Sequence, residues 1–497
     1  MMAMAVILSF LLPLAGTLIL AFSGGRLGAL ASSVVGVGSV GLASLATAWA
    51  TMAHAGGSEG ITLWTWIAVG DFQPTIGLAV DGLALVMMSV ITGVGFLIHL
   101  FAAWYMTGEE GITRFYAWMN LFVFSMMLLV LGDNLLLLFL GWEGVGLCSY
   151  GLIGYYYQGS ANGWAAFKAF VVTRIGDVFL ALGLFLIFME LGTLDIQQLL
   201  ALAPQQWQEG SATANLAALL VLGGALGKSA QVPLHTWLPA AHVQAPTVGS
   251  VILAGIMLKF GTYGLVRFAL QMTPEAFREA GVVVLILGVV SALYGAFAAL
   301  AQTDLKRLVA YTSINHMGYV IVGVAVAALT LDPTIRAVAL DGAVLQMFSH
   351  GLVTGALFLL VGMIQDRAHT REMGEFGGLL KTVPMLGWSF ILAAFASLGL
   401  PGLAHFPAEF QIFLATLSDA PVAIIVILGI AIIAGVFLKA LRETFLGEPR
   451  QRWQAMPDLS TREWLAVAPL LVLTVATGVA PSWVLDIIHR TTSALVL

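Results

Sequence analysis

The chain has 497 residues, of which 60% are hydrophobic and only 9% are charged. Soluble domains carry about 25% charged residues, so this composition all but excludes a soluble multidomain enzyme and predicts a polytopic membrane protein. The net charge of −6 comes without a basic run for nucleic acid, and the single cysteine, Cys148, excludes disulfides and cysteine-ligated iron–sulfur or zinc sites.

Apolar runs long enough to cross a bilayer, roughly 20 residues each, recur along the whole chain. No basic residue precedes the first run, 3–22, and further runs follow it, which predicts a transmembrane helix and not a cleaved signal. The predicted fold is one all-α membrane domain over 1–497 with about fourteen transmembrane helices, at 3–22, 28–50, 78–104, 114–131, 134–156, 164–190, 214–234, 247–270, 279–300, 305–329, 337–364, 384–417, 421–446 and 464–487.

Lysines and arginines fall unequally on the two sides of this predicted membrane. Of the twenty, eleven lie in connections on one side, and only Arg267, Arg278, Arg336 and Arg490 lie on the other. The richer side is cytoplasmic by the positive-inside rule, which predicts that both termini are external. The external connection 192–213 contains LDIQQLLALAPQQWQ, which predicts a short surface helix.

Two of the predicted spans are interrupted by prolines. The seventh is followed by Pro233 and Pro239, and the twelfth contains Pro401 and Pro407. A proline-broken helix frees backbone carbonyls, which only a hydrated, protein-lined interior tolerates, and such breaks are typical of transport sites. Two breaks five spans apart predict a pair of inverted five-helix repeats, with the chain divided into 1–110 (helices 1–3), 111–270 (helices 4–8), 276–446 (helices 9–13) and 460–497 (helix 14).

Ionisable side chains inside the spans are the candidate functional residues, because each costs about 2.5–3.5 kcal/mol on insertion scales and such groups usually line a polar path. Glu143 lies mid-span in LFLGWEGVGLCSYGLIGYYY, and Lys228 is its predicted partner. A carboxylate and a lysine in neighbouring helices shift each other's proton affinity, which is the basis of a relay. The alternative is a static ion pair that only fixes helix packing.

Lys168, Arg174 and Asp177 share the next span. Arg174 and Asp177 are three residues apart and so lie on one helix face, which favours an internal ion pair that steers the Glu143 site. Lys259, in AGIMLKFGTYG, has no acid near it in the sequence. A desolvated lysine can exchange protons near neutral pH, although a lysine that snorkels to the interface is the alternative.

Histidines extend this series, because imidazole titrates near neutral pH. His316 and His350 occupy polar notches in YTSINHMGY and QMFSHGLVTG, where a core role is equally open. With Lys259 and Glu409 they predict a polar axis, with Glu409 as the exit carboxylate and His405 one turn away. Further candidates are His235 and His242 near the first break, Asp304 and Lys306 as anchors at the start of a span, and Asp341 and Asp81. No metal-ligand spacing, phosphate loop or nucleophile motif is evident.

These motifs resemble those of the antiporter-like, proton-pumping membrane subunits of respiratory complex I and of related sodium/proton antiporter complexes. The segments DNLLLLFLGWEGVGLCSYGLIGYYY, AFKAFVVTRIGDVFLALGLF and GGALGKSAQVPL resemble subunit L. The segments LPAAHVQAPTVGSVILAGIMLKFGTYGLVRF, AQTDLKRLVAYTSINHMGY and HGLVTGALFLLVGMIQDRAHTREMGEFGGL resemble subunit M. The resemblance covers essentially the whole chain.

The resemblance implies fourteen core helices broken in helices 7 and 12, in a bacterial-type plasma membrane, with other membrane subunits as partners. Glu143 and Lys228 match the ion-pair and broken-helix residues, and Lys259 matches the central lysine of subunit M. Glu409 matches the terminal glutamate of subunit M, and three histidines match its pattern: His242, His316 and His350. The resemblance implies no cofactor in this chain, with FMN, iron–sulfur clusters and the quinone site in partner subunits.

Two motifs depart from the usual subunit M sequence. The usual LPDAH is LPAAH here, with Ala240, and the usual NFVGEF is HFPAEF, with His405, Pro407 and Ala408. The chain also ends soon after the last span, without the lateral helix of subunit L, which favours a position like that of subunit M.

The function predicted is therefore a proton-translocating subunit of a complex I-type NADH:quinone oxidoreductase, driven by redox chemistry in other subunits. Two alternatives stay open. One is a cation/proton antiporter subunit that works without redox chemistry, with sodium as the other candidate ion. The second is a proton-conducting partner of a membrane hydrogenase or an inorganic-carbon uptake complex. A direct quinone-reducing role is not expected, since no motif binds an electron carrier.

Overall fold

The computed structural model describes residues 1–70, 73–207 and 210–495, and most of them are helical. Among these residues, twelve helices or helix runs are long and apolar enough to cross a membrane. Two shorter apolar helices, Ala212–Lys228 and Pro384–Ser397, occupy the seventh and twelfth predicted spans. The predicted polytopic, helical membrane class is confirmed, while the count of fourteen stays a prediction.

The chain folds into two compact units. Unit 1 comprises Met1–Lys228, Phe260–Gly281 and Ile487–Leu497, and unit 2 comprises Ser229–Lys259 and Val282–Asp486. The predicted boundaries of the two inverted repeats stay a prediction.

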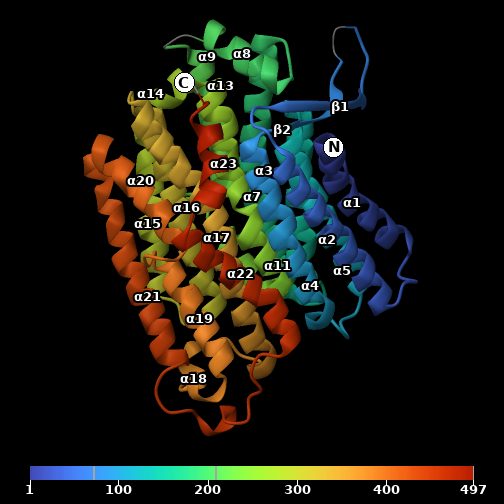
Figure 1. Ribbon diagram of the computed structural model, residues 1–497, viewed down its shortest axis with the longest axis vertical. Coiled ribbons are helices and arrows are strands. Elements are labelled where there is room, and N and C mark those ends of the chain that lie inside the picture. The colour runs from blue at the N-terminus through green and yellow to red at the C-terminus, as the bar shows by residue number, and fades with distance from the viewer. Residues whose placement is uncertain (71–72, 208–209, 496–497) are drawn as a thin grey trace. The chain divides into compact units, whose positions relative to one another are not determined.

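Unit 1 contains a group of packed helices at the N-terminal end of the chain. Helices α1 (Met2–Phe22), α2 (Ala29–Ala53) and α5 (Ile112–Leu131) pack against one another (Figure 1). Helices α3 (Gly82–Ser89) and α4 (Gly95–Tyr105) form one run with the π-turn Val90–Val94 between them. The remaining helices are α6 (Leu135–Ile153), α7 (Ser160–Leu191), α8 (Ile196–Gln206), α9 (Ala212–Lys228), α13 (Leu270–Met272), α14 (Pro274–Glu279) and α23 (Ser482–Thr492). Helix α8 is the short helix predicted within 192–213.

Unit 1 also contains one β-hairpin, a local addition to the predicted helical fold. Strands β1 (Glu59–Thr65) and β2 (Thr75–Val80) pair antiparallel (Figure 1), with a register irregularity between Thr62 and Trp64. The isoleucine, two threonines and tryptophan of β1 are residue types that favour an extended strand. The predicted start of the third span at residue 78 is therefore wrong. The helix begins at Gly82, where the Asp81 side chain accepts a hydrogen bond from the Ala84 backbone N–H at 2.9 Å.

Unit 2 is built around α17 (Pro333–Ala368), whose most apolar stretch is entirely buried. It packs against α16 (Leu305–Leu329), α19 (Pro384–Ser397), α20 (His405–Asp419) and α22 (Thr461–Val479). The other helices of the unit are α10 (Trp237–Gln244), α11 (Thr247–Ile252), α15 (Gly281–Leu300), α18 (Leu379–Thr382) and α21 (Leu428–Thr444), with a π-turn at Leu253–Met257. Both predicted breaks are present, because no helix covers 229–236 or 398–404.

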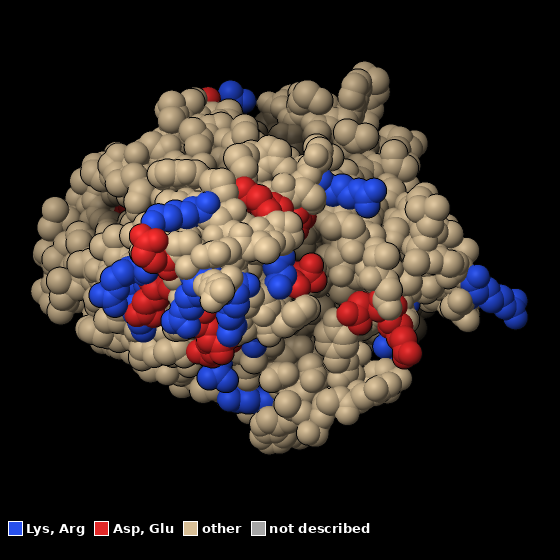
Figure 2. All heavy atoms as spheres, turned by 90° about the horizontal axis from the view of Figure 1, so that it is seen from below, with Lys and Arg blue, Asp and Glu red and all other residues tan. Residues whose placement is uncertain are grey.

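Charged side chains gather on the face that lies at the bottom of Figure 1, as Figure 2 shows. Helix α18 lies at this end of unit 2, where Lys381 Nζ lies 2.7 Å from Glu448. The neighbouring connections supply further ion pairs: Arg452–Glu375 at 2.7 Å, Arg367–Glu463 at 2.7 Å and Arg371–Asp304 at 3.0 Å. All four cations belong to the side of the predicted membrane that is richer in lysine and arginine.

Candidate functional site

The first buried polar cluster lies in unit 1, where α9 ends at Lys228. Its Nζ lies 3.3 Å from Asp177 Oδ1 on α7 and donates a hydrogen bond to the Trp142 carbonyl on α6 at 3.1 Å. The Trp142 indole N–H donates to the same Asp177 oxygen at 2.5 Å. All three side chains are at most 1% exposed, so Lys228 has a buried counter-ion and a buried acceptor.

Glycines explain why Lys228 and Asp177 come together. A Cβ added at Gly176 would lie 3.1 Å from the Gly227 Cα and 3.2 Å from the Gly223 carbonyl oxygen. Only small residues allow two membrane helices to approach this closely, so α7 and α9 pack backbone to backbone. Asp177 and Lys228, each one residue beyond a contact glycine, are thereby brought within ion-pair distance.

The predicted pairing of Glu143 with Lys228 is wrong, and so is the pairing of Arg174 with Asp177. Glu143 instead forms an ion pair with Arg174, and the two side chains are 21% and 35% exposed. Successive residues on a helix point about 100° apart. On α6, Trp142 therefore faces the interior, whereas the neighbouring Glu143 is partly exposed. Lys168, on the same helix as Arg174, is partly buried and forms no ion pair within the described ranges.

The second cluster lies in unit 2 and begins at Lys259. This side chain is fully buried, and its Nζ contacts the Ala254 carbonyl at 2.5 Å and His350 Nδ1 at 2.7 Å. The π-turn Leu253–Met257 precedes Lys259, and wide turns of this kind are frequent at functional sites. The prediction that Lys259 is buried, and is not a residue that snorkels to the interface, is confirmed.

Three histidines and one carboxylate complete this cluster. The His316 ring lies 5.7 Å from the His350 ring and 4.6 Å from the His405 ring, centroid to centroid. His316 Nδ1 lies 3.3 Å from Glu409 Oε1, and His405 Nδ1 lies 3.7 Å from the same oxygen. The structure therefore brings together five residues from α12 (Lys259–Gly264), α16, α17 and α20: Lys259, His350, His316, His405 and Glu409.

Two polar residues in this cluster were not among the predicted site residues. Gln346 Nε2 donates to Glu409 Oε1 at 2.9 Å, and Ser397 Oγ lies 2.9 Å from His316 Nε2. Gln346 precedes His350 by four residues on α17, so the shared helix face could have indicated it. Ser397 ends α19, and only the packing of that broken helix places it here.

The remaining predicted residues lie outside the two clusters. His242 is fully buried on α10 and packs its ring 4.6 Å from Phe358. His235 packs edge-on against Tyr294 at 4.7 Å. Asp304 caps α16 by accepting from the Arg307 N–H, and Lys306 lies 3.4 Å from the Ala245 carbonyl, as the predicted anchors of this helix start.

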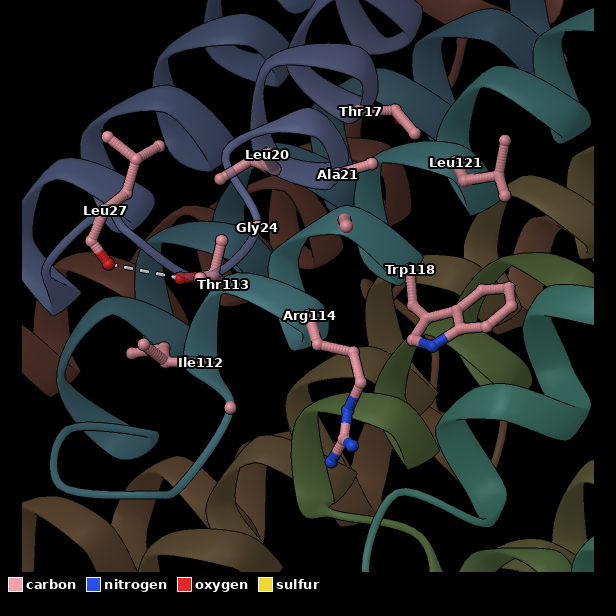
Figure 3. A pocket seen from close by; sticks show the side chains of 13 residues that line it. Thr17, Leu20, Ala21, Gly24, Leu27, Ile112, Thr113, Arg114, Trp118 and Leu121 are labelled. Carbon is pink, nitrogen blue, oxygen red and sulfur yellow. Dashed lines mark hydrogen bonds between the residues drawn. The ribbon is translucent and has the colours of Figure 1, made fainter.

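A large hollow in unit 1 is separate from these clusters. Its volume is about 610 Å³ and most of its lining residues are apolar. Figure 3 shows these residues on α1, on α5 and in the connections beside them. Arg114 extends away from Leu20 and Ala21 in this view, and its guanidinium lies over the Tyr155 and Tyr157 rings. The hollow holds no group suited to proton exchange near neutral pH, so we assign the chemistry to the buried clusters.

Unpaired polar atoms mark the cluster in unit 2. Within the described residues, Gln346 Oε1, His350 Nε2 and His316 Nδ1 have no hydrogen-bond partner. A buried polar group without a partner is costly, and bound water usually supplies the missing contact. The arrangement can therefore hold water and exchange protons between imidazole and carboxylate groups.

Comparison with known proteins gives a consistent set of similarities. The family model described as NADH:quinone oxidoreductase/Mrp antiporter, TM, matches residues 132–435, and the complex I chain 5 N-terminus model matches 66–116. Subunit L of NADH-quinone oxidoreductase from Pseudomonas aeruginosa is 43% identical, over 95% of this chain and 76% of its own length. Subunit M from Rickettsia prowazekii is 36% identical, over 73% of this chain and 72% of its own.

Subunit L from Escherichia coli is 46% identical over 79% of this chain, and the match spans 63% of that relative. A chain of respiratory complex I from Thermus thermophilus with bound NADH matches in structure with a TM-score of 0.85 and 26% identity. That match covers 99% of this chain and 98% of the other.

Proposed function

Because this chain belongs to the family of antiporter-like membrane subunits shared by NADH:quinone oxidoreductase and Mrp antiporters, we propose that it translocates protons as a subunit of a complex I-type NADH:quinone oxidoreductase. The observation that carries the proposal is the buried series Lys259–His350–His316–Glu409 in unit 2. The proposed partners of the chain are other membrane subunits. FMN, the iron–sulfur clusters and the quinone site belong to partner subunits.

In unit 1, the proposed role of Asp177 is to set the proton affinity of Lys228. A carboxylate 3.3 Å away favours the charged lysine, and the Trp142 N–H holds that carboxylate in place. Arg174 lies one helical turn from Asp177 and pairs with Glu143. Opening the Arg174–Glu143 pair would leave the arginine charge acting on Asp177 and Lys228, which would lower the proton affinity of the lysine.

In unit 2, Lys259 donates its proton to His350 Nδ1, which lies at hydrogen-bond distance. Imidazole can take a proton on one nitrogen and release it from the other, so His350 passes a proton onward from Nε2. Water bound at the unpaired atoms bridges the gap to His316. His316 Nδ1 then delivers the proton to Glu409, the proposed exit carboxylate.

The test is proton uptake driven by NADH in proteoliposomes that contain the assembled complex. Lys259→Met keeps the length of the side chain but removes its proton, and we expect proton uptake per NADH oxidised to fall sharply. Lys381→Met, at an exposed ion pair, is the matched control and should leave uptake unchanged. Normal uptake in a fully assembled Lys259→Met complex would contradict the proposal.

A cation/proton antiporter subunit is the second candidate, because the matching family model covers both classes of protein. Ion dependence separates them. A complex I-type subunit co-purifies with NADH-oxidising partners, and its proton uptake should not require sodium. Sodium-dependent proton movement in vesicles that lack NADH would favour the antiporter.

We propose that both termini lie on the external side of a bacterial inner membrane. The distribution of lysine and arginine supports this orientation, with eleven cations in the connections of one side and four in those of the other. Tags at each terminus should be cleaved by protease added to intact spheroplasts. Cleavage only after the membrane is opened would reverse the assignment.

A further inference from the structure

The cluster on α16 and α20 has the composition and spacing of a metal site. His316, His405 and Glu409 each offer one ligand atom, and these atoms lie within 4.8 Å of one another. We propose that His316, His405 and Glu409 bind a Zn²⁺ ion, and that bound Zn²⁺ arrests proton transfer through unit 2. The second part of this proposal rests on the proposed function, whereas the binding itself does not.

The separation of the ligand atoms fits tetrahedral zinc. Zinc binds imidazole nitrogen and carboxylate oxygen at about 2.0–2.2 Å, so neighbouring ligand atoms around a tetrahedral ion lie about 3.4 Å apart. His316 Nδ1 lies 3.3 Å from Glu409 Oε1, and His405 Nδ1 lies 3.7 Å from it. Adjustments of less than an ångström would bring these two pairs to that separation, and all three ligand atoms already lie within 4.8 Å of one another.

The ring nitrogens of the two histidines also indicate a ligand. His316 Nδ1 is buried and has no hydrogen-bond partner among the described residues, and the fully buried His405 lies near the same Glu409 oxygen. His316 is held through Nε2 by Ser397 Oγ, which leaves Nδ1 directed at the carboxylate. A ligand histidine is usually oriented by a hydrogen bond at its other nitrogen, as His316 is here.

The donor set selects the kind of cation. Magnesium and calcium take six or more oxygen ligands, but this cluster supplies two imidazoles and one carboxylate. Two histidines and one glutamate with an open fourth position form a donor set that zinc uses in proteins. A short ligand-spacing motif is absent because His316 lies on α16, whereas His405 and Glu409 lie on α20.

Bound zinc would occupy the atoms that the proton needs. Zinc binds the neutral imidazole and the ionised carboxylate, so it excludes a proton from His316 Nδ1, His405 Nδ1 and Glu409 Oε1. The proposed exit of unit 2 would then be closed while NADH oxidation and the partner subunits remain intact.

The binding test uses the full chain in detergent micelles. Equilibrium dialysis with Zn²⁺ alone should give one tight site per chain, and Co²⁺ should give the intense visible bands of a tetrahedral site. Removing only a group that hydrogen-bonds a ligand costs about 10–100-fold in metal affinity, so loss of a ligand itself in His405→Ala or Glu409→Gln should cost about 100-fold or more. The control is His242→Ala, which removes a buried histidine outside the cluster and should keep the tight site.

Thermal melting followed by tryptophan fluorescence identifies any variant that has not folded, and Glu409→Gln preserves the size of the side chain. Absence of a tight zinc site in the wild-type chain would overturn the metal site. So would a zinc affinity equal to that of the wild type in the two folded variants.

The functional test uses the assembled complex in proteoliposomes. Zinc should inhibit NADH-driven proton uptake at the concentration that fills the site in the isolated chain. Whatever uptake remains in the His405→Ala complex should need about 100-fold more zinc for half inhibition. A filled site with undiminished uptake would overturn the arrest while the binding result stands, and it would also count against Glu409 as the exit. Loss of uptake in Lys259→Met without any zinc site supports the proposed function alone.

Discussion

Lys259 and His350 are separated by 91 residues in the chain, yet Lys259 Nζ lies 2.7 Å from His350 Nδ1 in the interior of unit 2. An ammonium group buried away from water is costly, so this lysine gains from giving its proton to a neighbour that can accept it. This pair is a step where a proton can move without leaving a fixed charge behind.

His350→Gln tests that step. Glutamine keeps a hydrogen-bonding side chain of similar reach beside Lys259, but it cannot carry a proton between two atoms. We expect proton uptake by the reconstituted complex to fall to the level of Lys259→Met, while NADH oxidation by the partner subunits continues in uncoupled vesicles. Proton uptake equal to that of the wild type would show that the proton bypasses His350.

Asp177→Asn and Glu143→Gln test the corrected ion pairs in unit 1. Removing one partner of a buried pair typically costs about 3–5 kcal/mol, and Asp177 is the buried partner of Lys228. The Arg174–Glu143 pair is partly exposed, so its loss should cost no more than about 1 kcal/mol. The unfolding temperature in detergent should therefore fall further for Asp177→Asn than for Glu143→Gln. A larger fall for Glu143→Gln would favour the predicted pairing of Glu143 with Lys228.

Gly176→Leu tests the contact that places Asp177 beside Lys228. A leucine side chain cannot fit where a Cβ would already lie 3.1 Å from the Gly227 backbone, so α7 and α9 must separate. We expect lower thermal stability and loss of proton uptake. Gly163→Leu, on the same helix but with open space around its Cβ position, is the matched control and should behave like wild type. Equal effects of the two substitutions would remove the argument from close packing.

Asp81→Asn tests an ion pair at the start of α3, where Arg267 lies 2.6 Å away. Burial by itself raises the pKa of Asp81, but the Arg267 guanidinium and the Ala84 N–H outweigh it and hold the pKa below its ordinary value of 3.8. A lowered folded-state pKa contributes stability above the unfolded-state pKa, and this contribution is lost as the pH falls through the folded-state value.

The thermal stability of the Asp81→Asn variant should therefore lie below that of the wild type at neutral pH. The difference between them should shrink as the pH falls below 3.8. Melting curves across a pH series measure it, with Glu448→Gln at an exposed pair as the control. A difference that stays constant down to the lowest pH would contradict the assigned cause.

The local sequence was sufficient to predict the membrane class, the position of most spans and the two proline breaks. Hydropathy adds up over about 20 consecutive residues, so it needs no knowledge of what a helix packs against. The same holds for Lys228, Lys259, His316, His350 and Glu409 as candidates, because a charge or an imidazole in an apolar run is visible in the sequence. The β-hairpin was missed because most of it lies in the connection between two predicted spans, where hydropathy does not show that two short strands pair.

Only the tertiary structure decided which of these groups meet. Each residue turns a helix by about 100°, so a hydropathy run that defines a span leaves open whether Trp142 or Glu143 faces inward. The pairing of Lys228 with Asp177 follows from the glycine contact between α7 and α9. The meeting of His316 with His405 and Glu409 follows from the packing of α20 on α16. Ion pairs form only within a few ångströms. A hydropathy pattern locates a helix along the chain but leaves open its rotation and its neighbours.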